Sequence, residues 1–193
     1  HDYIRGFLPI LYSIGWSPLK FWKKEVKNGH VERVMDEEIK SSAIEVHGIN
    51  TRTTYITCPP DPEESLGIRL PFLNLLLKKT GKTGEDFTFE ITVIDDKNIQ
   101  RRIILTTFTK KMKPMMYSGF VPLKLSTFWD HININLTTVT NEIFGAKYVE
   151  TVKIKIHPNC RIRRVYFTDR LYSQRELPSD YKKKISEESK AAP

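Results

Sequence analysis

Three histidines and two cysteines are the candidate zinc ligands of this sequence: His47, His131, His157, Cys58 and Cys160. Structural zinc sites use cysteine and histidine pairs at short, regular spacing, which these residues lack. The segment His-Pro-Asn-Cys at 157–160 is not a zinc knuckle. We therefore expect no bound metal or cofactor, and we expect the two cysteines to be buried structural residues.

Catalytic motifs are incomplete. Gly81-Lys82-Thr83 resembles the end of a phosphate-binding P-loop, but Leu76 stands where the first glycine of that loop belongs. The sequence contains no Gly-x-Ser-x-Gly and no His-Glu-x-x-His. Adjacent acidic residues occur in predicted turns and helix starts, where solvated or capping carboxylates are ordinary. They are Glu37/Glu38, Glu63/Glu64 and Asp95/Asp96. We predict that the protein is not an enzyme.

A basic pattern near the end of the chain is more informative. In the candidate strand Val149–His157, lysines alternate with Val152, Ile154 and Ile156. Because successive side chains of a strand point to opposite faces, Lys153 and Lys155 should point away from the core.

Three arginines follow in the next candidate strand, residues 161–168: Arg161, Arg163 and Arg164. Ile162 has the wrong parity to share a face with Val165 and Phe167, so we expect a bulge near Arg163-Arg164. If the turn at 157–159 makes a hairpin, the arginines and the two lysines form one basic surface. The alternative is that some of the arginines pair internally, for example with Asp169 or Glu150.

The overall charge supports an acidic partner. The formal net charge is +8, and it is uneven: residues 1–100 contain 13 Lys/Arg and 15 Asp/Glu, whereas residues 101–193 contain 18 and 8. Nucleic acid, an anionic membrane surface or an acidic protein would suit this excess, and a solvated basic face without a partner is the alternative.

The tryptophans Trp16, Trp22 and Trp129 allow two interpretations. Exposed indole rings can stack on sugars, which would indicate a carbohydrate-binding module. Since tryptophan is usually largely buried, we expect all three to pack in the core or at its edges.

Composition limits the kind of protein. The chain has 193 residues, of which 39% are hydrophobic and 28% charged, typical of one globular domain. The longest apolar stretches, Phe7–Leu11 and Leu75–Leu77, are too short to span a membrane. Two widely spaced cysteines favour a reducing compartment over a secreted disulfide scaffold.

Period-two alternation is the main structural signal. Phe87, Phe89, Ile91 and Val93 share one face, and residues 87–108 are typical of a hairpin. The other predicted strands are Val31–Val34, Ala43–His47, Thr53–Thr57, Phe72–Leu77, Met115–Pro122 and Ile132–Leu136, besides the two described above. Many short strands with frequent turns predict an all-β protein, an antiparallel sandwich or jelly roll.

One or two short helices complete the predicted fold. Residues 138–144 fit a helix ended by Gly145, and Asp36–Lys40 fit a second. We expect a single β domain at 1–181 and a flexible, polar, lysine-rich tail at 182–193.

Long irregular segments of the chain resemble one known family. They are Phe7–Gly15, Thr53–Pro59, Leu66–Phe72, Asp95–Asn98, Tyr148–Thr151, Asn159–Phe167, Asp169–Ser173 and Glu176–Pro178. They are collinear with the cilia- and flagella-associated protein twenty family over residues 6–181.

The resemblance implies a β jelly roll similar to carbohydrate-binding modules and a non-enzymatic structural role in the axoneme of cilia and flagella. It also implies partners: the α/β-tubulin of doublet microtubules, at the inner junction of the A- and B-tubules, and a neighbouring junction protein. The implied locations are the axonemal cytoskeleton and the basal body or centriole.

Tubulin is acidic, so Lys153, Lys155, Arg161, Arg163 and Arg164 are the candidate tubulin-binding residues. A basic nucleic-acid-binding domain and a carbohydrate-binding domain are the alternatives. The absence of an RNP-like motif around Tyr166 disfavours nucleic acid.

Overall fold

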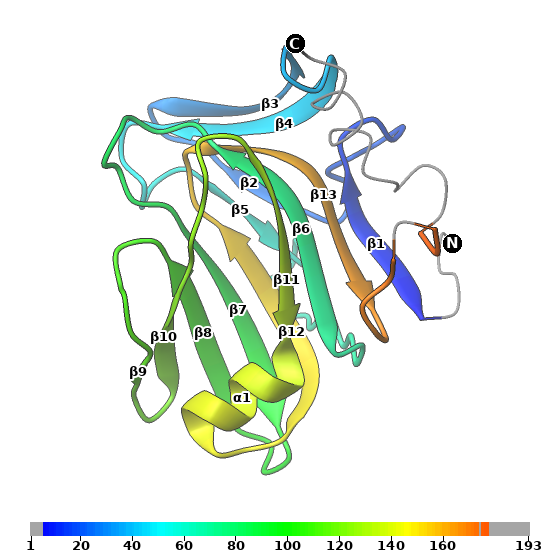
Figure 1. Ribbon diagram of the computed structural model, residues 1–193, viewed down its shortest axis with the longest axis vertical. Coiled ribbons are helices and arrows are strands. Elements are labelled where there is room, and N and C mark those ends of the chain that lie inside the picture. The colour runs from blue at the N-terminus through cyan, green and yellow to red at the C-terminus, as the bar shows by residue number, and fades with distance from the viewer. Residues whose placement is uncertain (1–5, 174, 178–193) are drawn as a thin grey trace.

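The computed structural model describes residues 6–173 and 175–177. Two β-sheets pack face to face, and one helix lies at one end of them (Figure 1). The predicted antiparallel sandwich is confirmed. The predicted tail at 182–193 lies outside the described residues.

The first sheet has six strands, all antiparallel to their neighbours. Their order is β11 (Trp129–Asn135), β6 (Phe72–Lys79), β13 (Cys160–Thr168), β4 (Ser41–Gly48) and β3 (Gly29–Asp36), and β1 (Phe7–Tyr12) pairs with β13 beside this path. Strand β13 is therefore central, and it carries the bulge that its parity predicted, between Ile162 and Arg164.

The second sheet has seven strands. Their order is β2 (Lys23–Glu25), β5 (Tyr55–Cys58), β12 (Tyr148–Ile156), β7 (Thr88–Asp95), β8 (Gln100–Thr106), β10 (Ser118–Pro122) and β9 (Lys113–Pro114). The predicted hairpin at 87–108 is the β7–β8 pair, and β10 runs parallel to β8. Sequence periodicity missed β1, β2 and β9.

The core lies between the sheets. Strand β7 alternates half-buried and buried residues, with Phe89, Ile91 and Val93 fully buried, as its period-two pattern predicts. From the facing sheet, Leu73, Leu75 and Leu77 of β6 and Phe167 of β13 join the same apolar cluster. Interdigitation of two such faces is the packing of a β-sandwich.

The helix α1 (Leu136–Phe144) starts two residues before its predicted position. The side chain of Asn135 accepts a hydrogen bond from the backbone N–H of Thr138 at 3.1 Å, so Asn135 is the N-cap. Gly145 ends the helix in the left-handed conformation, with φ of 62°.

The second predicted helix, Asp36–Lys40, is wrong. Residues 37–40 form the turn between β3 and β4. The Asp36 carboxylate accepts hydrogen bonds from the backbone N–H groups of Glu38 and Ile39, which fixes a turn in place of a helical start. Lys40 then adopts a positive φ of 51°, which reverses the chain into β4.

The turn at 157–159 does not make a hairpin, which was the condition for one basic surface. Strand β12 belongs to the seven-stranded sheet and β13 to the six-stranded sheet, so this turn crosses from one layer to the other. Both flanking strands carry apolar residues that must be buried. When the two strands lie in opposite sheets, both sets of apolar residues face the core between the sheets.

Two of the three tryptophans follow the prediction. Trp22 and Trp129 are buried, with 5% and 6% of their surface exposed. The prediction is wrong for Trp16, whose ring lies in solvent on the β1–β2 loop. Both cysteines are free and buried, as predicted. Among the described residues, no helix is long and apolar enough to cross a membrane.

Candidate functional site

The two predicted lysines lie on the outer face of the seven-stranded sheet. Strand register sets Lys155 beside Thr57 of β5 and Glu90 of β7, and sets Lys153 beside Thr92 of β7. Both positions are opposite in parity to the fully buried Ile154 and Ile156. The prediction that their amines point away from the core is confirmed.

A hollow of about 370 Å³ follows this face from β2 to the β7–β8 pair. We call it the basic groove. Its lining residues are Lys23, Glu25, Tyr55, Thr57, Pro59, Pro60, Pro62, Glu64, Thr92, Gln100, Val152, Lys153 and Lys155. A smaller hollow of about 90 Å³ shares Thr92, Lys153 and Lys155 and adds Glu90 and Arg102.

Val152 is half-buried and lines this groove, against the prediction that it faces the core. The register between β12 and β7 shifts between Thr151 and Lys153, which identifies a bulge at Val152. A bulge adds one residue to one strand and so reverses the facing of its neighbours.

Positive charge in the groove is only partly compensated. Lys23 pairs with Glu25 at 3.0 Å, and Arg102 approaches Glu90 at 3.4 Å. Lys153 and Lys155 make no ion pair with any described residue. These two ammonium groups can therefore receive an anionic group from outside without first breaking an internal ion pair.

The pKa of Lys155 is lowered, first by partial burial; the negative charge of Glu90 opposes this, and the positive charges of Lys153 and Arg102 add to the lowering. Its ammonium group lies 4.1 Å from the centre of the Tyr55 ring, which supplies a weak cation–π contact. A carboxylate placed between Lys153 and Lys155 would relieve this crowding of like charges.

The nearest acidic group, Glu90, is already engaged. Its carboxylate lies 2.5 Å from Nε2 of His157, and the other ring nitrogen of His157 lies 3.0 Å from the carbonyl oxygen of Thr51. Burial alone would raise the pKa of Glu90, but the bond from His157 and the charges of Arg102 and Lys155 outweigh it and lower that pKa.

The three predicted arginines do not join the lysines. Arg161 is in the other sheet, where its guanidinium donates to Asp36 at 2.8 Å and to Glu45 at 2.8 Å. The internal pairing left open by the sequence is therefore observed for Arg161, but the partners are on β3 and β4 and are not Asp169 or Glu150.

Arg163 and Arg164 are buried, with 6% and 3% of their surface exposed. Arg163 donates to the hydroxyl of Ser41 and to the carbonyl of Ser42, both at 2.8 Å. Both guanidinium groups also lie over the ring of Tyr12. The prediction of one basic surface made by five residues is thus wrong. The turn at 157–159 sends β13 into the opposite sheet, and its arginines pack internally there.

Arg161 belongs to a buried ion cluster around Asp36, which is fully buried. The Asp36 carboxylate also accepts hydrogen bonds from Lys78 at 2.6 Å and from the indole of Trp129 at 3.3 Å. Burial alone would raise the pKa of Asp36, but the bonds from Lys78 and Arg161 outweigh it and lower that pKa to about 2.

This lowered pKa predicts acid sensitivity. The ionised form of Asp36 is favoured in the folded state relative to an ordinary pKa of 3.8, so its contribution is fully present above about pH 4. As the pH falls from about 4 to 2, about 2 kcal/mol of the free energy of unfolding should be lost. Urea unfolding at several pH values measures this, and the loss should be smaller in Asp36→Asn. An equal loss in both proteins would assign the acid sensitivity to other carboxylates.

Among the described residues, one group could offer three ligands to a metal: His30, Glu32 and Glu45 bring ligand atoms within 4.8 Å of one another. Glu45 already pairs with His30 at 2.6 Å and with Arg161, and Glu32 lies 3.8 Å from His30, so all three groups have internal partners. The zinc candidates of the sequence do not gather into such a group in the described part of the chain. What the basic groove offers chemically is recognition of negative charge.

Sequence comparison identifies the family. The sequence matches the CFA20 domain over residues 1–185. The chain belongs to the CFA20 domain family. It is 48% identical over 179 residues to "Cilia- and flagella-associated protein 20" of Chlamydomonas reinhardtii, which covers 92% of each chain. It is 44% identical over 177 residues to the protein of that name from Caenorhabditis elegans, which covers 92% of this chain and 86% of the other. Membership of the CFA20 domain family supports a role in cilia and flagella.

Solved structures similar to this CFA20 domain include carbohydrate-binding modules. The C-terminal family 22 module of Clostridium thermocellum Xyn10B has a TM-score of 0.48 and 10% identity, over 90% of this chain and 99% of that chain. A family 11 module from the same organism has a TM-score of 0.46 and 11% identity, over 87% and 98%. At this distance the likeness concerns the β-sandwich fold alone.

Sequence reasoning missed four residues around the two lysines: Lys23, Tyr55, Glu90 and Arg102. A signal existed for Glu90, because the alternation of residues 87–93 places it outward with Thr88 and Thr92. The other three come near the two lysines only through the strand order β2-β5-β12-β7-β8, which local periodicity does not encode.

Proposed function

We propose that this CFA20 domain is a non-enzymatic structural protein of the axoneme. It binds tubulin at the inner junction that links the A- and B-tubules of doublet microtubules, and it thereby supports axoneme stability and ciliary motility. A neighbouring junction protein is its second partner. The basic groove is the surface that meets acidic side chains of tubulin.

The observation that carries this proposal is that Lys153 and Lys155 lie side by side in a groove and make no ion pair with a described residue. The charge of Glu90, opposite Lys155, offsets the positive charge there only in part, because Glu90 is paired with His157. An acidic protein surface would supply the missing counter-charges and steer the approach of the two proteins. Repeated binding along a microtubule lattice adds avidity, so modest affinity at each site is sufficient.

The groove and a nucleic-acid site differ in one feature that can be checked. Single-stranded nucleic acids need several exposed aromatic rings to stack on, besides a basic channel. Among the groove-lining residues Tyr55 is the one aromatic side chain, and Lys155 already covers it. The groove therefore favours acidic protein over single-stranded nucleic acid, and duplex DNA is left to the experiment.

Co-sedimentation tests the proposed function. The protein should pellet with microtubules and should not pellet with beads that carry duplex DNA at the same salt concentration. Binding to microtubules should fall as salt rises from about 0.05 to 0.2 M, because the Debye length shortens to below about 10 Å. Equal binding to DNA, or microtubule binding that salt leaves unchanged, would contradict the proposal.

A further inference from the structure

The loop between β1 and β2 holds a tryptophan fully in solvent. Trp16 is as exposed as a free side chain, at 102%, and Ile14 and Phe21 in the same loop are 43% and 39% exposed. Large apolar side chains gathered on a surface commonly mark interaction sites. Among the described residues, Trp16 is the most exposed large hydrophobic side chain.

Hydrogen bonds hold this loop in place. The backbone N–H of Gly15 donates to the carbonyl of Tyr12 at 2.9 Å, and Arg33 donates to the carbonyl of Gly15 at 2.8 Å. Further along, the N–H of Lys20 donates to the carbonyl of Ser17 at 3.2 Å. The indole of Trp16 is thus presented by a fixed backbone, which lowers the entropy cost of binding through it.

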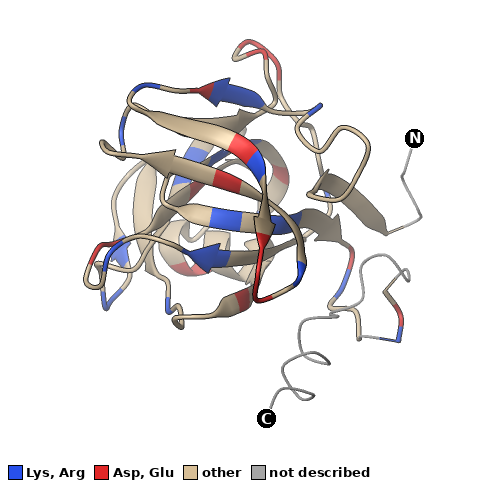
Figure 2. Cartoon of the chain, turned by 90° about the horizontal axis from the view of Figure 1, so that it is seen from above, with Lys and Arg blue, Asp and Glu red and all other residues tan. Residues whose placement is uncertain are grey.

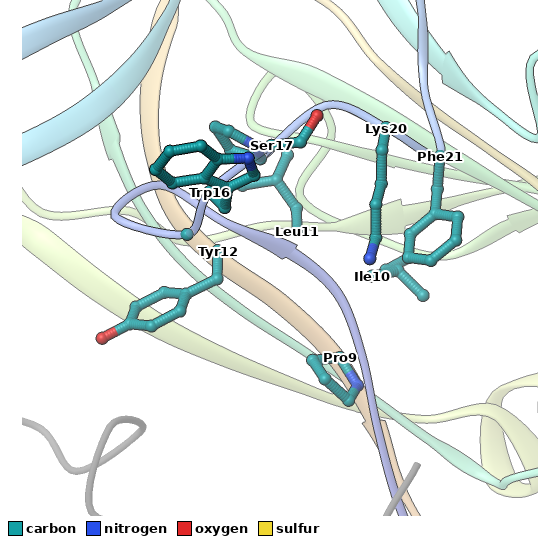
Figure 3. Close-up of a pocket in the computed structure, with 10 residues that line it drawn as sticks. Pro9, Ile10, Leu11, Tyr12, Trp16, Ser17, Lys20 and Phe21 are labelled. Atoms are coloured by element: carbon teal, nitrogen blue, oxygen red, sulfur yellow. The ribbon is translucent and has the colours of Figure 1, made fainter. Parts of the chain in front are cut away.

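A hollow of about 260 Å³ lies beside the Trp16 indole; we call it the aromatic groove. Figure 3 shows Trp16 and Tyr12 on one side of it and Lys20 and Phe21 on the other, with Pro9 at one end. The remaining lining residues are Ile10, Leu11, Gly15, Ser17 and Pro18. Its surface is therefore made of aromatic, aliphatic and proline side chains.

Charge at the aromatic groove has one sign. Lys20 is the only charged residue of the lining set, and the Arg33 guanidinium reaches the loop at Gly15. Arg163 and Arg164 also lie over the Tyr12 ring, but both are buried and so are not part of the rim. Apolar contacts with cations at the rim complement a segment that combines apolar residues with acidic ones.

The nearby sheet edge is closed to an added strand. Within the described residues β1 pairs only with β13, but Pro9 removes one backbone donor from β1. The carbonyl of Ile10 accepts a hydrogen bond from the indole of Trp22 at 2.8 Å. A partner segment must therefore bind through side chains and ring faces, because the main chain of β1 is not free for a ladder.

We propose that the aromatic groove binds an extended, proline-containing segment with acidic residues from a partner protein. A polyproline II helix has no internal hydrogen bonds and is already extended, so it can dock on rings of tryptophan and tyrosine at low entropy cost. Lys20 then pairs with an acidic residue of the segment. This site goes beyond the proposed tubulin contact, because it shares no lining residue with the basic groove.

An array of synthetic peptides tests this proposal on the full chain. Its peptides contain prolines and apolar residues in varied order, together with either glutamate or lysine. For each peptide, a counterpart has the prolines replaced. We expect the wild-type protein to select proline-containing peptides with glutamate. Trp16→Ala should weaken binding to the selected peptides at least about tenfold, as for a central aromatic anchor, without lowering the melting temperature. Lys20→Glu should shift the selection toward lysine-containing peptides.

Two controls separate this site from other effects. Ile49→Ala removes another exposed apolar side chain, 82% exposed, and should leave peptide binding unchanged. Lys153→Glu/Lys155→Glu should also leave it unchanged, so that failure of the tubulin proposal does not affect this one. Selection without regard to proline would overturn the proposal, as would Trp16-dependent self-association or sugar binding in place of peptide binding.

Discussion

Replacing Asp36 with alanine should lower the free energy of unfolding by about 3–5 kcal/mol, since one member of a buried ion cluster is removed. The fully buried carboxylate accepts hydrogen bonds from Lys78 and Arg161 and from the indole of Trp129. It also accepts from two backbone N–H groups of the β3–β4 turn. Without it, Lys78 keeps only one carboxylate partner and the turn loses its acceptor.

Glu38 is the matched control for Asp36. It also contacts Lys78, at 2.5 Å, but its side chain is 35% exposed. Glu38→Ala should cost less than about 1 kcal/mol, as for exposed ion pairs. Urea unfolding of both variants measures the difference, with Asp36→Asn as a milder variant if the alanine protein does not fold. Equal stability losses for Asp36→Ala and Glu38→Ala would contradict the structural role of the cluster.

Reversing both groove lysines should have the largest effect on partner binding. Lys153→Glu/Lys155→Glu should weaken microtubule binding about ten- to hundredfold, because two attractions become repulsions at the centre of the basic groove. Both side chains are on an outer strand face, so the protein should remain folded. The melting temperature should fall modestly, because Lys155→Glu replaces the cation opposite Glu90 with a second carboxylate. Microtubule co-sedimentation over a range of protein concentrations measures the affinity.

The control for this variant is Lys97→Glu/Lys147→Glu. It changes the net charge by the same amount, and both lysines are exposed outside the basic groove. If binding depends on the groove, the control should lose at most a fewfold in affinity. Equal losses of affinity in the two variants would show that binding to microtubules depends on the net charge of the protein and not on the basic groove.

Local periodicity predicted most of the fold. Strand β7 and residues 153–156 of β12 alternate because one face is buried, and this rule depends only on neighbouring residues. The odd parity of Ile162 located the bulge in β13 for the same reason. The predicted helix Asp36–Lys40 does not form, because the Asp36 carboxylate accepts hydrogen bonds from the backbone N–H groups two and three residues later and so stabilises a turn.

The candidate site depended on facts that a local pattern does not contain. Lys153 and Lys155 were predicted correctly as outward-facing, since alternation decides this within one strand. Whether Arg161 is exposed or paired depends on which sheet contains β13. In the six-stranded sheet, Arg161 pairs with Asp36 and Glu45, which are far from it in the sequence. Figure 2 shows the Lys/Arg and Asp/Glu positions of the described residues interspersed across the strands.

Chemical cross-linking to tubulin tests the central claim most directly. A carbodiimide joins an amine to a carboxylate only where the two are in contact, so it reports which lysines meet acidic residues of the partner. On microtubules decorated with the full chain, mass spectrometry should find Lys153, Lys155 and Lys23 joined to aspartate or glutamate of tubulin. Cross-links confined to lysines outside the basic groove, such as Lys97 or Lys147, would contradict the assignment of this groove as the tubulin contact.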